Sequence, residues 1–274
     1  MSEQELIKAA LAEDLAGGVD ITSQATIAAD ANSVADFVAR MDGVIAGINI
    51  AHAVLAEVGL TDVTLLKKDG DHVRVGDVLI TVRGNTRAIL LAERTALNFF
   101  GHLSGIATLT SKWVAEVSGT KCQVRDTRKT TPGMRIIEKY AVRMGGGTNH
   151  RMNLNDGALI KDNHIAAAGG VNAAFAQVRS AYPAAEIEIE VDTLDQLKEV
   201  LPQRPDLVLL DNMTPDQCAQ AVALVNGLCK LEASGGISIA NARAYAQSGV
   251  DYIAIGALTH SAPVIDIGLD LRAE

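Results

Sequence analysis

Six short apolar runs, separated by helical segments, constrain the fold of this chain more than any other feature. Between residues 123 and 256 they read QVRD, ALIKD, EIEIEVD, LVLLD, KLEAS and YIAIG. Strands that alternate with helices form a parallel sheet with right-handed crossovers. Six such units predict an α/β fold in which an incomplete or open β/α barrel of the TIM type occupies the C-terminal part of the chain.

The segments between these runs carry the start and stop signals of helices. Thr214 and Pro215 supply an N-cap followed by a proline at the first helical position, and Gly227 stands just past the expected end. Ser238 begins another helix that should stop near Gly249. These signals support the alternation of strands and helices.

The first third of the chain has a different pattern and predicts a smaller α+β domain. An apolar helix should end at Gly59, and residues 67–86 alternate apolar and polar residues around glycines, which is typical of a β-hairpin. A long apolar helix is expected over 93–117. We therefore predict an N-terminal α+β domain over 1–108 and a catalytic β/α barrel over 109–259. The tail, 260–274, is expected to pack back on the first domain.

The composition narrows the class of protein. Apolar residues make up 48% of the chain but aromatic residues only 3%, so the core must consist of Ala, Val, Leu and Ile, which suits buried parallel strands. A net charge of -9 argues against a general nucleic-acid binder. No apolar run reaches transmembrane length, and the acidic N-terminus lacks the pattern of a signal peptide. The scattered cysteines, Cys122, Cys218 and Cys229, favour reduced thiols in a cytoplasmic protein without membrane partners.

One segment opposes the charge of the rest of the chain. From Arg125 to Asp162 there are eight Lys or Arg residues against four Asp or Glu residues, a net charge of +4. The same segment contains TTPG, a triple glycine (145–147) and TNHR, which a solvated basic helix face would not carry. The pattern therefore predicts an anion-binding pocket in an acidic protein.

Polar residues stand where the predicted strands end, which is where a β/α barrel collects its chemistry. They follow the strands QVR, ALI, LVLL and KLEA and comprise Thr127, Arg128, Lys129, Lys161, Asp211 and Ser234. In EIEIEVD the alternation places Glu188 and Glu190 on the barrel face, with Lys161 as their natural counter-charge. We interpret Glu188 and Glu232 as members of an internal salt-bridge network, and Glu190, Asp211 and Lys161 as functional residues.

Two glycine-containing loops follow the last two strands. Ser234, Gly235 and Gly236 precede one helix, and Gly256 and Ala257 follow the next strand. Consecutive backbone N–H groups at such positions bind phosphate, and this is the usual phosphate position of the barrel. Acids in the middle of the barrel could hold hydroxyls, or Mg²⁺ through water. Together the residues predict an enzyme that binds a phosphorylated sugar and a compact polyanion.

Three stretches resemble the quinolinate phosphoribosyltransferases, also called carboxylating nicotinate-nucleotide pyrophosphorylases. They are ERTALNFFGHLSGIAT, RDTRKTTPGMRIIEKYAVRMGGGTNHRMNLNDGALIKDNHI and EASGGIS. The resemblance implies that phosphoribosyl pyrophosphate and quinolinate give nicotinate mononucleotide, pyrophosphate and CO₂, a step of de novo NAD biosynthesis. The turn EDLAGGVDITS is slightly longer than the usual form of the family.

The resemblance also assigns roles to residues of this sequence. The two quinolinate carboxylates would meet Arg128, His150 and Arg151, with Arg94 supplied by the partner subunit of a homodimer. Lys129 and Lys161 would lie near the pyrophosphate and the reacting ring, and Thr127 would join the substrate site. Glu190 and Asp211 would hold the ribose hydroxyls or a hydrated Mg²⁺. The 5-phosphate would be held by the loop residues Ser234, Gly235, Gly236, Gly256 and Ala257.

Three other functions compete with this reading. A paralogous pyrophosphorylase of the same fold could use another acceptor, although Arg128, His150 and Arg151 would leave charge unmatched on a monocarboxylate. A nucleic-acid binder would need exposed aromatic side chains beside the cations, and Tyr140 is the only aromatic residue in the basic segment. A biotinyl-type carrier would need a lysine in a characteristic turn motif, which Lys67 and Lys68 lack.

Overall fold

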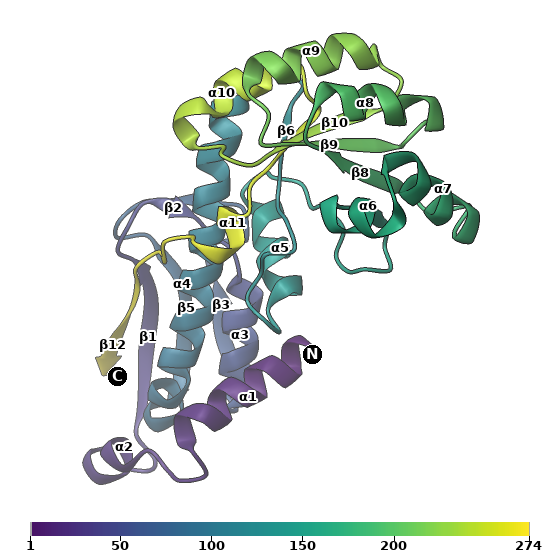
Figure 1. Ribbon diagram of the computed structural model, residues 1–274. Coiled ribbons are helices and arrows are strands. Elements are labelled where there is room, and N and C mark those ends of the chain that lie inside the picture. The colour runs from purple at the N-terminus through teal and green to yellow at the C-terminus, as the bar shows by residue number, and fades with distance from the viewer. Residues whose placement is uncertain (1, 274) are drawn as a thin grey trace. The chain divides into compact units, whose positions relative to one another are not determined.

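A computed structural model describes residues 2–273, and within it the chain forms two compact units (Figure 1). The N-terminal unit comprises Met1–Ser111, Thr130–Gly146 and Thr259–Glu274, and the sheet unit comprises Lys112–Lys129 and Gly147–Leu258. Residues 130–146 therefore group with the N-terminal unit, whereas the sequence analysis placed them in a domain over 109–259. The tail beyond residue 259 also belongs to the N-terminal unit.

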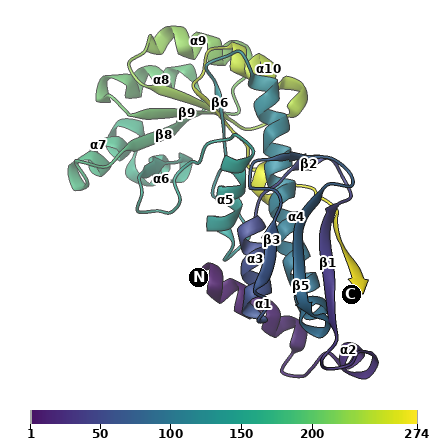
Figure 2. The ribbon, with the colours of Figure 1, turned by 180° about the vertical axis from the view of Figure 1, so that it is seen from behind.

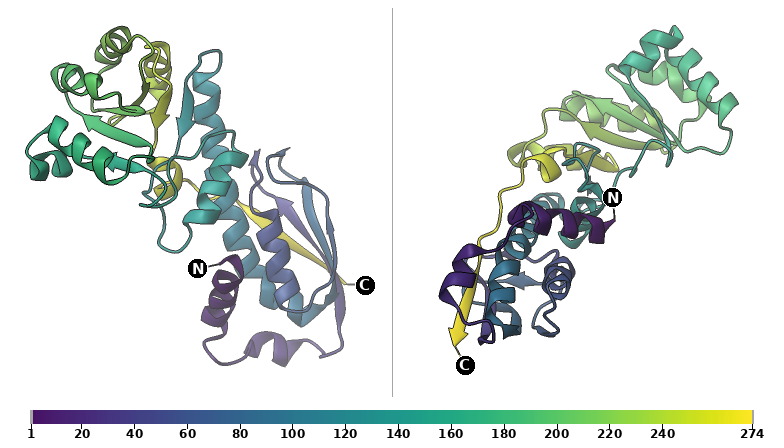
Figure 3. Two further views of the ribbon diagram at one scale, coloured as in Figure 1. Left: turned by 90° about the vertical axis from the view of Figure 1, so that its right-hand side faces the viewer. Right: turned by 90° about the horizontal axis from the view of Figure 1, so that it is seen from below.

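The N-terminal unit is built on an antiparallel sheet with the strand order β12-β1-β5-β3. Its strands are β1 (Asn32–Ala39), β3 (Asp62–Leu65), β5 (Val78–Asn85) and β12 (Ile267–Ala273). A separate two-stranded sheet pairs β2 (Gly43–Val44) with β4 (His72–Val73). The helices are α1 (Glu3–Leu15), α2 (Ile21–Thr26), α3 (Ile48–Glu57), α4 (Thr86–Val117) and α5 (Arg135–Met144). Figure 2 shows β1 and β5 running alongside α4, and the left view of Figure 3 shows α3 and α4 packed along the sheet.

The predicted hairpin over 67–86 is not a simple hairpin. β5 pairs with β3, while β4 lies between them in sequence and pairs with β2. Two tight turns cause this excursion, because Asp71 accepts a hydrogen bond from the N–H of Lys68 at 3.0 Å and Asp77 accepts one from the N–H of Arg74 at 3.1 Å. The alternation of the sequence correctly indicated strands but not their partners.

Helix α4 extends over 32 residues, further than the predicted 93–117. Gly101 and Gly105, one turn apart, let the C-terminal segment approach its backbone. A Cβ atom on Gly105 would lie 2.1 Å from the carbonyl oxygen of Pro263, and the N–H of Ile265 donates to the carbonyl of Gly101 at 3.1 Å. This close approach leads the chain into β12, which pairs antiparallel with β1.

The sheet unit is a parallel six-stranded sheet with the order β6-β11-β10-β9-β8-β7. Each of the six predicted runs forms one strand, and the strands are β6 (Gln123–Arg125), β7 (Ala158–Ile160), β8 (Ile187–Val191), β9 (Leu207–Asp211), β10 (Lys230–Ser234) and β11 (Tyr252–Ala254). Within residues 2–273, β6 and β7 do not pair with each other, so the barrel is open. The predicted α/β class and incomplete barrel are confirmed.

Helices flank this sheet (Figure 1). They are α6 (Asp162–Ala168), α7 (Val171–Ala181), α8 (Leu194–Val200), α9 (Pro215–Val225) and α10 (Ile239–Gln247), with a 3₁₀ turn at Leu201–Gln203. The short helix α11 (Ala257–His260) follows β11 where the chain leaves the sheet unit. The predicted boundaries are confirmed, since Thr214 caps α9 and Ser238 caps α10. Among the described residues, no helix is both long enough and apolar enough to span a membrane.

Candidate active site

A pocket of about 360 Å³ opens at the carboxyl ends of the parallel strands. It is lined entirely by residues of the sheet unit. The lining residues are Thr127, Arg128, Lys129, His150, Arg151, Leu159, Lys161, Glu190, Leu209, Asp211, Glu232, Ser234 and Ala254. Most of the predicted site residues therefore converge on one cavity.

The remaining predicted residues do not line this pocket. Gly235 and Gly236 follow β10, and Gly256 and Ala257 follow β11, in loops next to the lining residues Ser234 and Ala254. Arg94 belongs to α4 in the N-terminal unit. Its side chain is 74% exposed and lies 3.8 Å from the carboxylate of the adjacent Glu93.

Lys161 and Glu190 form the ion pair that the sequence pattern predicted. Lys161 Nζ lies 2.7 Å from Glu190 Oε2, and the two residues come from neighbouring parts of the sheet, after β7 and on β8. The lysine side chain is 47% exposed, whereas that of the glutamate is 9% exposed. The ammonium group therefore remains accessible from the pocket while it balances a buried carboxylate.

Further acids crowd the same side of the pocket. Burial, and then the charges of Glu190 and Asp192, raise the pKa of Asp211 above its usual range, although Lys161 opposes the shift. Three carboxylates near one lysine leave an excess of negative charge. Such a site suits sugar hydroxyls or a hydrated divalent cation, because either would stabilise the ionised carboxylates.

The loop after β10 has a conformation that only glycine can adopt without strain. Gly235 has a φ of +87°, and a Cβ atom there would lie 2.1 Å from Asn212 Oδ1. Asn212 in turn donates from its side-chain amide to Asp211 Oδ2 at 2.7 Å. The glycine thus lets the loop approach the end of β9 and keeps Asp211 oriented.

Arg151 brings an unused hydrogen-bond donor to the pocket. Its Nη1 donates to the carbonyl of Gly157 at 2.8 Å, but its Nε is buried and has no hydrogen-bond partner among the described residues. Burial, and then the positive charge of Arg128, lower the pKa of Arg151. Two guanidinium groups that repel each other, one with a buried free donor, are suited to a ligand carboxylate.

His150 is fixed by contacts of both its backbone N–H and its imidazole ring. The buried carboxylate of Asp126 accepts from the backbone N–H of His150 at 2.8 Å and from the side-chain amide of Asn149 at 2.5 Å. The ring Nδ1 accepts from the N–H of Arg151 at 2.7 Å, and Nε2 lies 2.7 Å from Glu188 Oε2. These contacts favour the tautomer with the proton on Nε2.

Glu188 and Glu232 form the internal network that the sequence analysis expected. Arg125 Nη1 donates to Glu232 Oε2 at 2.9 Å, and its guanidinium lies 4.1 Å from the ring centroid of Tyr252. His150, Glu188 and Glu232 each bring one ligand atom within 4.8 Å of the others, a spacing that a metal ion could use. However, the guanidinium of Arg125 already supplies a cation to Glu232.

The sequence analysis missed four lining residues, Leu159, Leu209, Ala254 and Glu232. Glu232 was interpreted only as a structural acid, yet it also lines the pocket. Strand alternation and register contain the missing signal, since Glu232 pairs with Leu209, which in turn pairs with Glu190 of the pocket face. Applying the same alternation to every strand would have identified the apolar lining residues Leu159, Leu209 and Ala254.

Models of one protein family match both parts of the chain. The model of the quinolinate phosphoribosyl transferase C-terminal domain matches residues 106–270, and that of the N-terminal domain matches residues 20–104. The chain belongs to the quinolinate phosphoribosyltransferase family. The resemblance noted in the three sequence stretches is thereby confirmed.

Individual members of the quinolinate phosphoribosyltransferase family are similar over almost the whole chain. A nicotinate-nucleotide pyrophosphorylase (carboxylating) of Mycobacterium leprae is 50% identical, covering 98% of this chain and 96% of the relative. A probable enzyme of the same name from Bacillus subtilis is 41% identical over 94% of this chain and 90% of its own length. The crystal structure of nicotinate-nucleotide pyrophosphorylase from Ehrlichia chaffeensis has a TM-score of 0.95 at 41% identity, covering 99% of both chains.

Replacing Glu232 with Gln should flatten the pH dependence of stability. Burial raises the pKa of Glu232 from its usual 4.5 to about 7, so between these values the folded protein holds a proton that the unfolded chain has lost. The stabilising effect of this proton is complete below about pH 4.5 and is lost as the pH rises through about 7, by at most about 3 kcal/mol. The glutamine variant has no such proton to lose.

Thermal unfolding followed by circular dichroism between about pH 5 and pH 8 measures this slope. Glu199→Gln, which changes an exposed carboxylate of α8, is the matched control. Equal slopes in the wild type and both variants would contradict the assignment of a protonated Glu232.

Proposed function

We propose that this chain transfers the phosphoribosyl group of phosphoribosyl pyrophosphate to quinolinate. Loss of CO₂ then gives nicotinate mononucleotide, a step of de novo NAD biosynthesis. The observation that carries the proposal is that one pocket brings together the guanidinium groups of Arg128 and Arg151 and the acids Glu190 and Asp211. The names of the relatives, which act as carboxylating pyrophosphorylases, support the same reaction.

The arginines of the pocket suit quinolinate, a pyridine-2,3-dicarboxylate. The unused Nε donor of Arg151 and the neighbouring charge of Arg128 would each meet a carboxylate, since guanidinium groups bind planar carboxylates in a bidentate manner. His150 would also contribute, in exchange for part of its contact with Glu188. A further cation, Arg94 of the partner subunit, would complete the site in a homodimer.

The acids of the pocket suit the ribose of phosphoribosyl pyrophosphate. Glu190 and Asp211 would accept hydrogen bonds from the ribose hydroxyls, and Thr127 and Lys129 would contact the pyrophosphate. The backbone N–H groups of the two loops after β10 and β11 would hold the 5-phosphate. These loop residues are Ser234, Gly235, Gly236, Gly256 and Ala257.

The same acids fit a hydrated Mg²⁺ bound with phosphoribosyl pyrophosphate. The raised pKa of Asp211 reflects burial and two neighbouring carboxylates, and oxygen ligands of this kind are what Mg²⁺ prefers. Glu190 and Asp211 would hold the ion through water. When bound, the ion would stabilise the negative charge that develops on the departing pyrophosphate.

The chain's own residues mainly orient and stabilise charge. The pyridine nitrogen of quinolinate is itself the nucleophile, so no strong general base is required. The ribosyl centre becomes oxocarbenium-like while negative charge develops on the departing pyrophosphate. Lys161, accessible beside Glu190, would stabilise that negative charge. Once ribosylated, the cationic pyridine nitrogen stabilises the carbanion that remains when the adjacent carboxylate leaves as CO₂. Holding two mutually repelling polyanions together is the main task of the pocket.

A paralogous pyrophosphorylase with another acceptor is the alternative. The two arginines favour a dicarboxylate, because a monocarboxylate would leave one guanidinium unmatched.

Among cell compartments, the cytoplasm fits the three free cysteines, two of which are buried.

The purified protein should convert phosphoribosyl pyrophosphate, Mg²⁺ and quinolinate to nicotinate mononucleotide and CO₂ in equal amounts. Product formation is followed by chromatography and CO₂ by release from labelled quinolinate. Nicotinate replaces quinolinate in a parallel reaction, and no nucleotide is expected there. Absence of product with both acids would contradict the proposed acceptor and favour the paralogous function.

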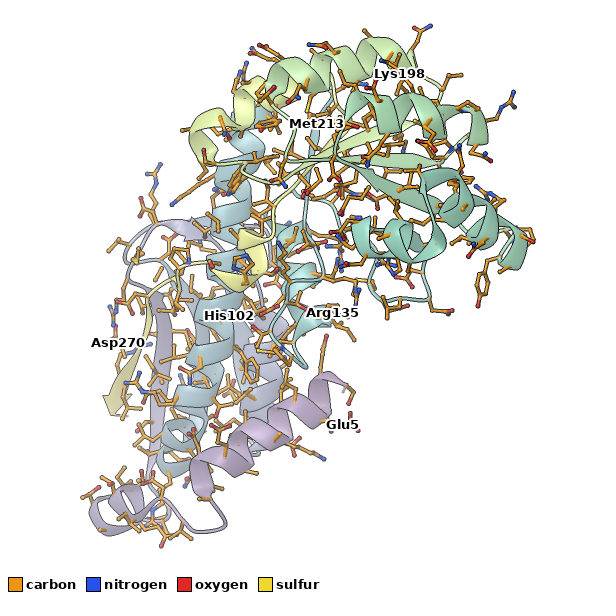
Figure 4. The ribbon with its side chains drawn as sticks, viewed as in Figure 1. Glu5, His102, Arg135, Lys198, Met213 and Asp270 are labelled. Carbon is orange, nitrogen blue, oxygen red and sulfur yellow. The ribbon has the colours of Figure 1, made fainter. Side chains whose placement is uncertain are left out.

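Replacing Arg151 with Ala should weaken quinolinate binding and leave phosphoribosyl pyrophosphate binding nearly unchanged. The loss should be about 2–5 kcal/mol, because a ligand carboxylate would be buried without its bidentate partner. Calorimetric titration of each ligand measures both affinities. Lys198→Ala removes an exposed cation of α8 (labelled in Figure 4), which pairs with Asp195 of the same helix, and controls for the change in net charge. An equal loss for both ligands would contradict the assignment.

Arg94 should act in the active site of the partner subunit. Separate Arg94→Ala and Lys161→Ala proteins are expected to be inactive, whereas their mixture after subunit exchange should recover roughly a quarter of wild-type activity, because a hybrid dimer contains one intact site. Rates are measured before and after exchange, and native mass spectrometry verifies the hybrids. Verified hybrids without activity would show that Arg94 does not act in trans.

A further inference from the structure

We propose that Glu138, held by His102, is a positioning residue for the pocket cations Arg128 and Lys129. It touches no substrate. Instead it fixes the loop 130–134, which directly follows these cations in the chain. The inference rests on the proposed function only in assigning Arg128 and Lys129 to anionic substrates.

Glu138 is a fully buried carboxylate with both oxygens engaged. It lies on α5 with no exposed surface. Its Oε1 lies 2.9 Å from His102 Nε2 of α4, and its Oε2 accepts a hydrogen bond from the backbone N–H of Thr131 at 3.0 Å. Figure 4 marks His102 on α4 and Arg135 in the first turn of α5. One buried side chain thus joins a long helix to a loop without secondary structure.

The loop has a second anchor on the same helix. Arg135 Nε donates to Thr130 Oγ1 at 3.0 Å, and the N–H of Met134 donates to the carbonyl of Thr131 at 3.0 Å. Gly133 has a φ of +84°, which gives the loop a sharp turn before α5 begins. Residues 130 and 131 are therefore held by side chains one helical turn apart on α5.

Helix α5 is itself fixed within the N-terminal unit. Tyr140 Oη donates to Asp69 Oδ2 at 2.7 Å, and Asp69 also accepts from the N–H of Ile48 at the start of α3 at 2.9 Å. At the other end, a Cβ atom on Gly145 would lie 2.3 Å from the carbonyl oxygen of Ala107 in α4. The helix that holds the loop thus has little freedom to move.

The anchored loop is separated from the pocket cation Lys129 by a very short length of chain. Thr131 is two residues beyond Lys129, a separation of at most about 7 Å of extended chain. The N–H of Lys129 in turn donates to Thr127 Oγ1 at 3.0 Å, so the residues from Thr127 onward form a continuous constrained segment. A displacement of the loop must therefore move the lysine, and small displacements of orienting groups reduce rates strongly.

Three substitutions separate positioning from simple stability. Glu138→Leu removes both acceptors. Glu138→Gln keeps an acceptor for Thr131, and its amide can donate to His102 if the ring takes the other tautomer. Ser33→Ala removes a buried hydrogen bond to Thr86 at the start of α4, away from the loop, and is the matched control. Each variant is assayed at room temperature, where circular dichroism shows it fully folded, and the midpoint of thermal unfolding is recorded.

The leucine variant should lose about tenfold to a hundredfold in kcat/KM for both substrates, whereas the glutamine variant and Ser33→Ala should stay close to wild type. Thermal unfolding midpoints should fall for both the leucine variant and Ser33→Ala. A folded leucine variant with wild-type kcat and KM would overturn the proposal. If that variant does not fold, His102→Leu takes its place. His102→Leu should lower kcat/KM, and His102→Gln should restore it. Wild-type kinetics in His102→Leu would also overturn the proposal.

A binding measurement keeps this test separate from the identity of the reaction. Inorganic pyrophosphate is titrated calorimetrically into the wild type and each variant, because it probes the cations whatever the acceptor. Weaker pyrophosphate binding in Glu138→Leu but not in Ser33→Ala supports positioning even if quinolinate proves not to be the substrate. Unchanged pyrophosphate binding in the folded leucine variant would refute it.

Discussion

The buried network of Arg125, Glu232, His150 and Glu188 is the constraint on which the pocket depends. Charged groups in the interior of a barrel are costly unless they are paired. Here Arg125 lies against Glu232 and His150 against Glu188, so the deepest acids are matched by bases of the same sheet unit. Arg151 also interacts electrostatically with Glu188, so this network contributes to the charge of the pocket.

The pocket therefore shows how an acidic protein can bind polyanions. Burial, and then the charge of Arg128, lower the pKa of Arg151, so a bound anion would stabilise both guanidinium groups. In the same pocket Lys161 balances Glu190, while Asp211 remains poorly compensated. The pocket thus brings together two guanidinium groups and an acid without a full counter-charge. Two substrates of different chemistry, a dicarboxylate and a phosphorylated sugar, would satisfy both kinds of group at once.

Much of this arrangement follows from local patterns in the sequence, and the remainder depends on long-range contacts. Alternation in EIEIEVD correctly placed Glu188 and Glu190 on one face, because the side-chain period of a strand is two. It could not show that β4 pairs with β2, nor that Glu232 lines the pocket, because both depend on residues far apart in the chain. The incomplete barrel was predicted from the six repeated units, although no local signal specifies that β6 and β7 do not pair. The roles of Arg94 and of the phosphate loops remain predictions.

Residues 130–146 interrupt the sheet unit between two pairs of pocket cations. Arg128 and Lys129 precede this segment, His150 and Arg151 follow it, and all four line one pocket of the sheet unit. The segment itself folds with the N-terminal unit, where Glu138 and Tyr140 fix it to α4 and to Asp69. The two pairs of cations are thus separated in the chain by a segment that folds elsewhere, yet they line the same pocket. Holding like charges near one another costs free energy, which bound substrate anions would offset.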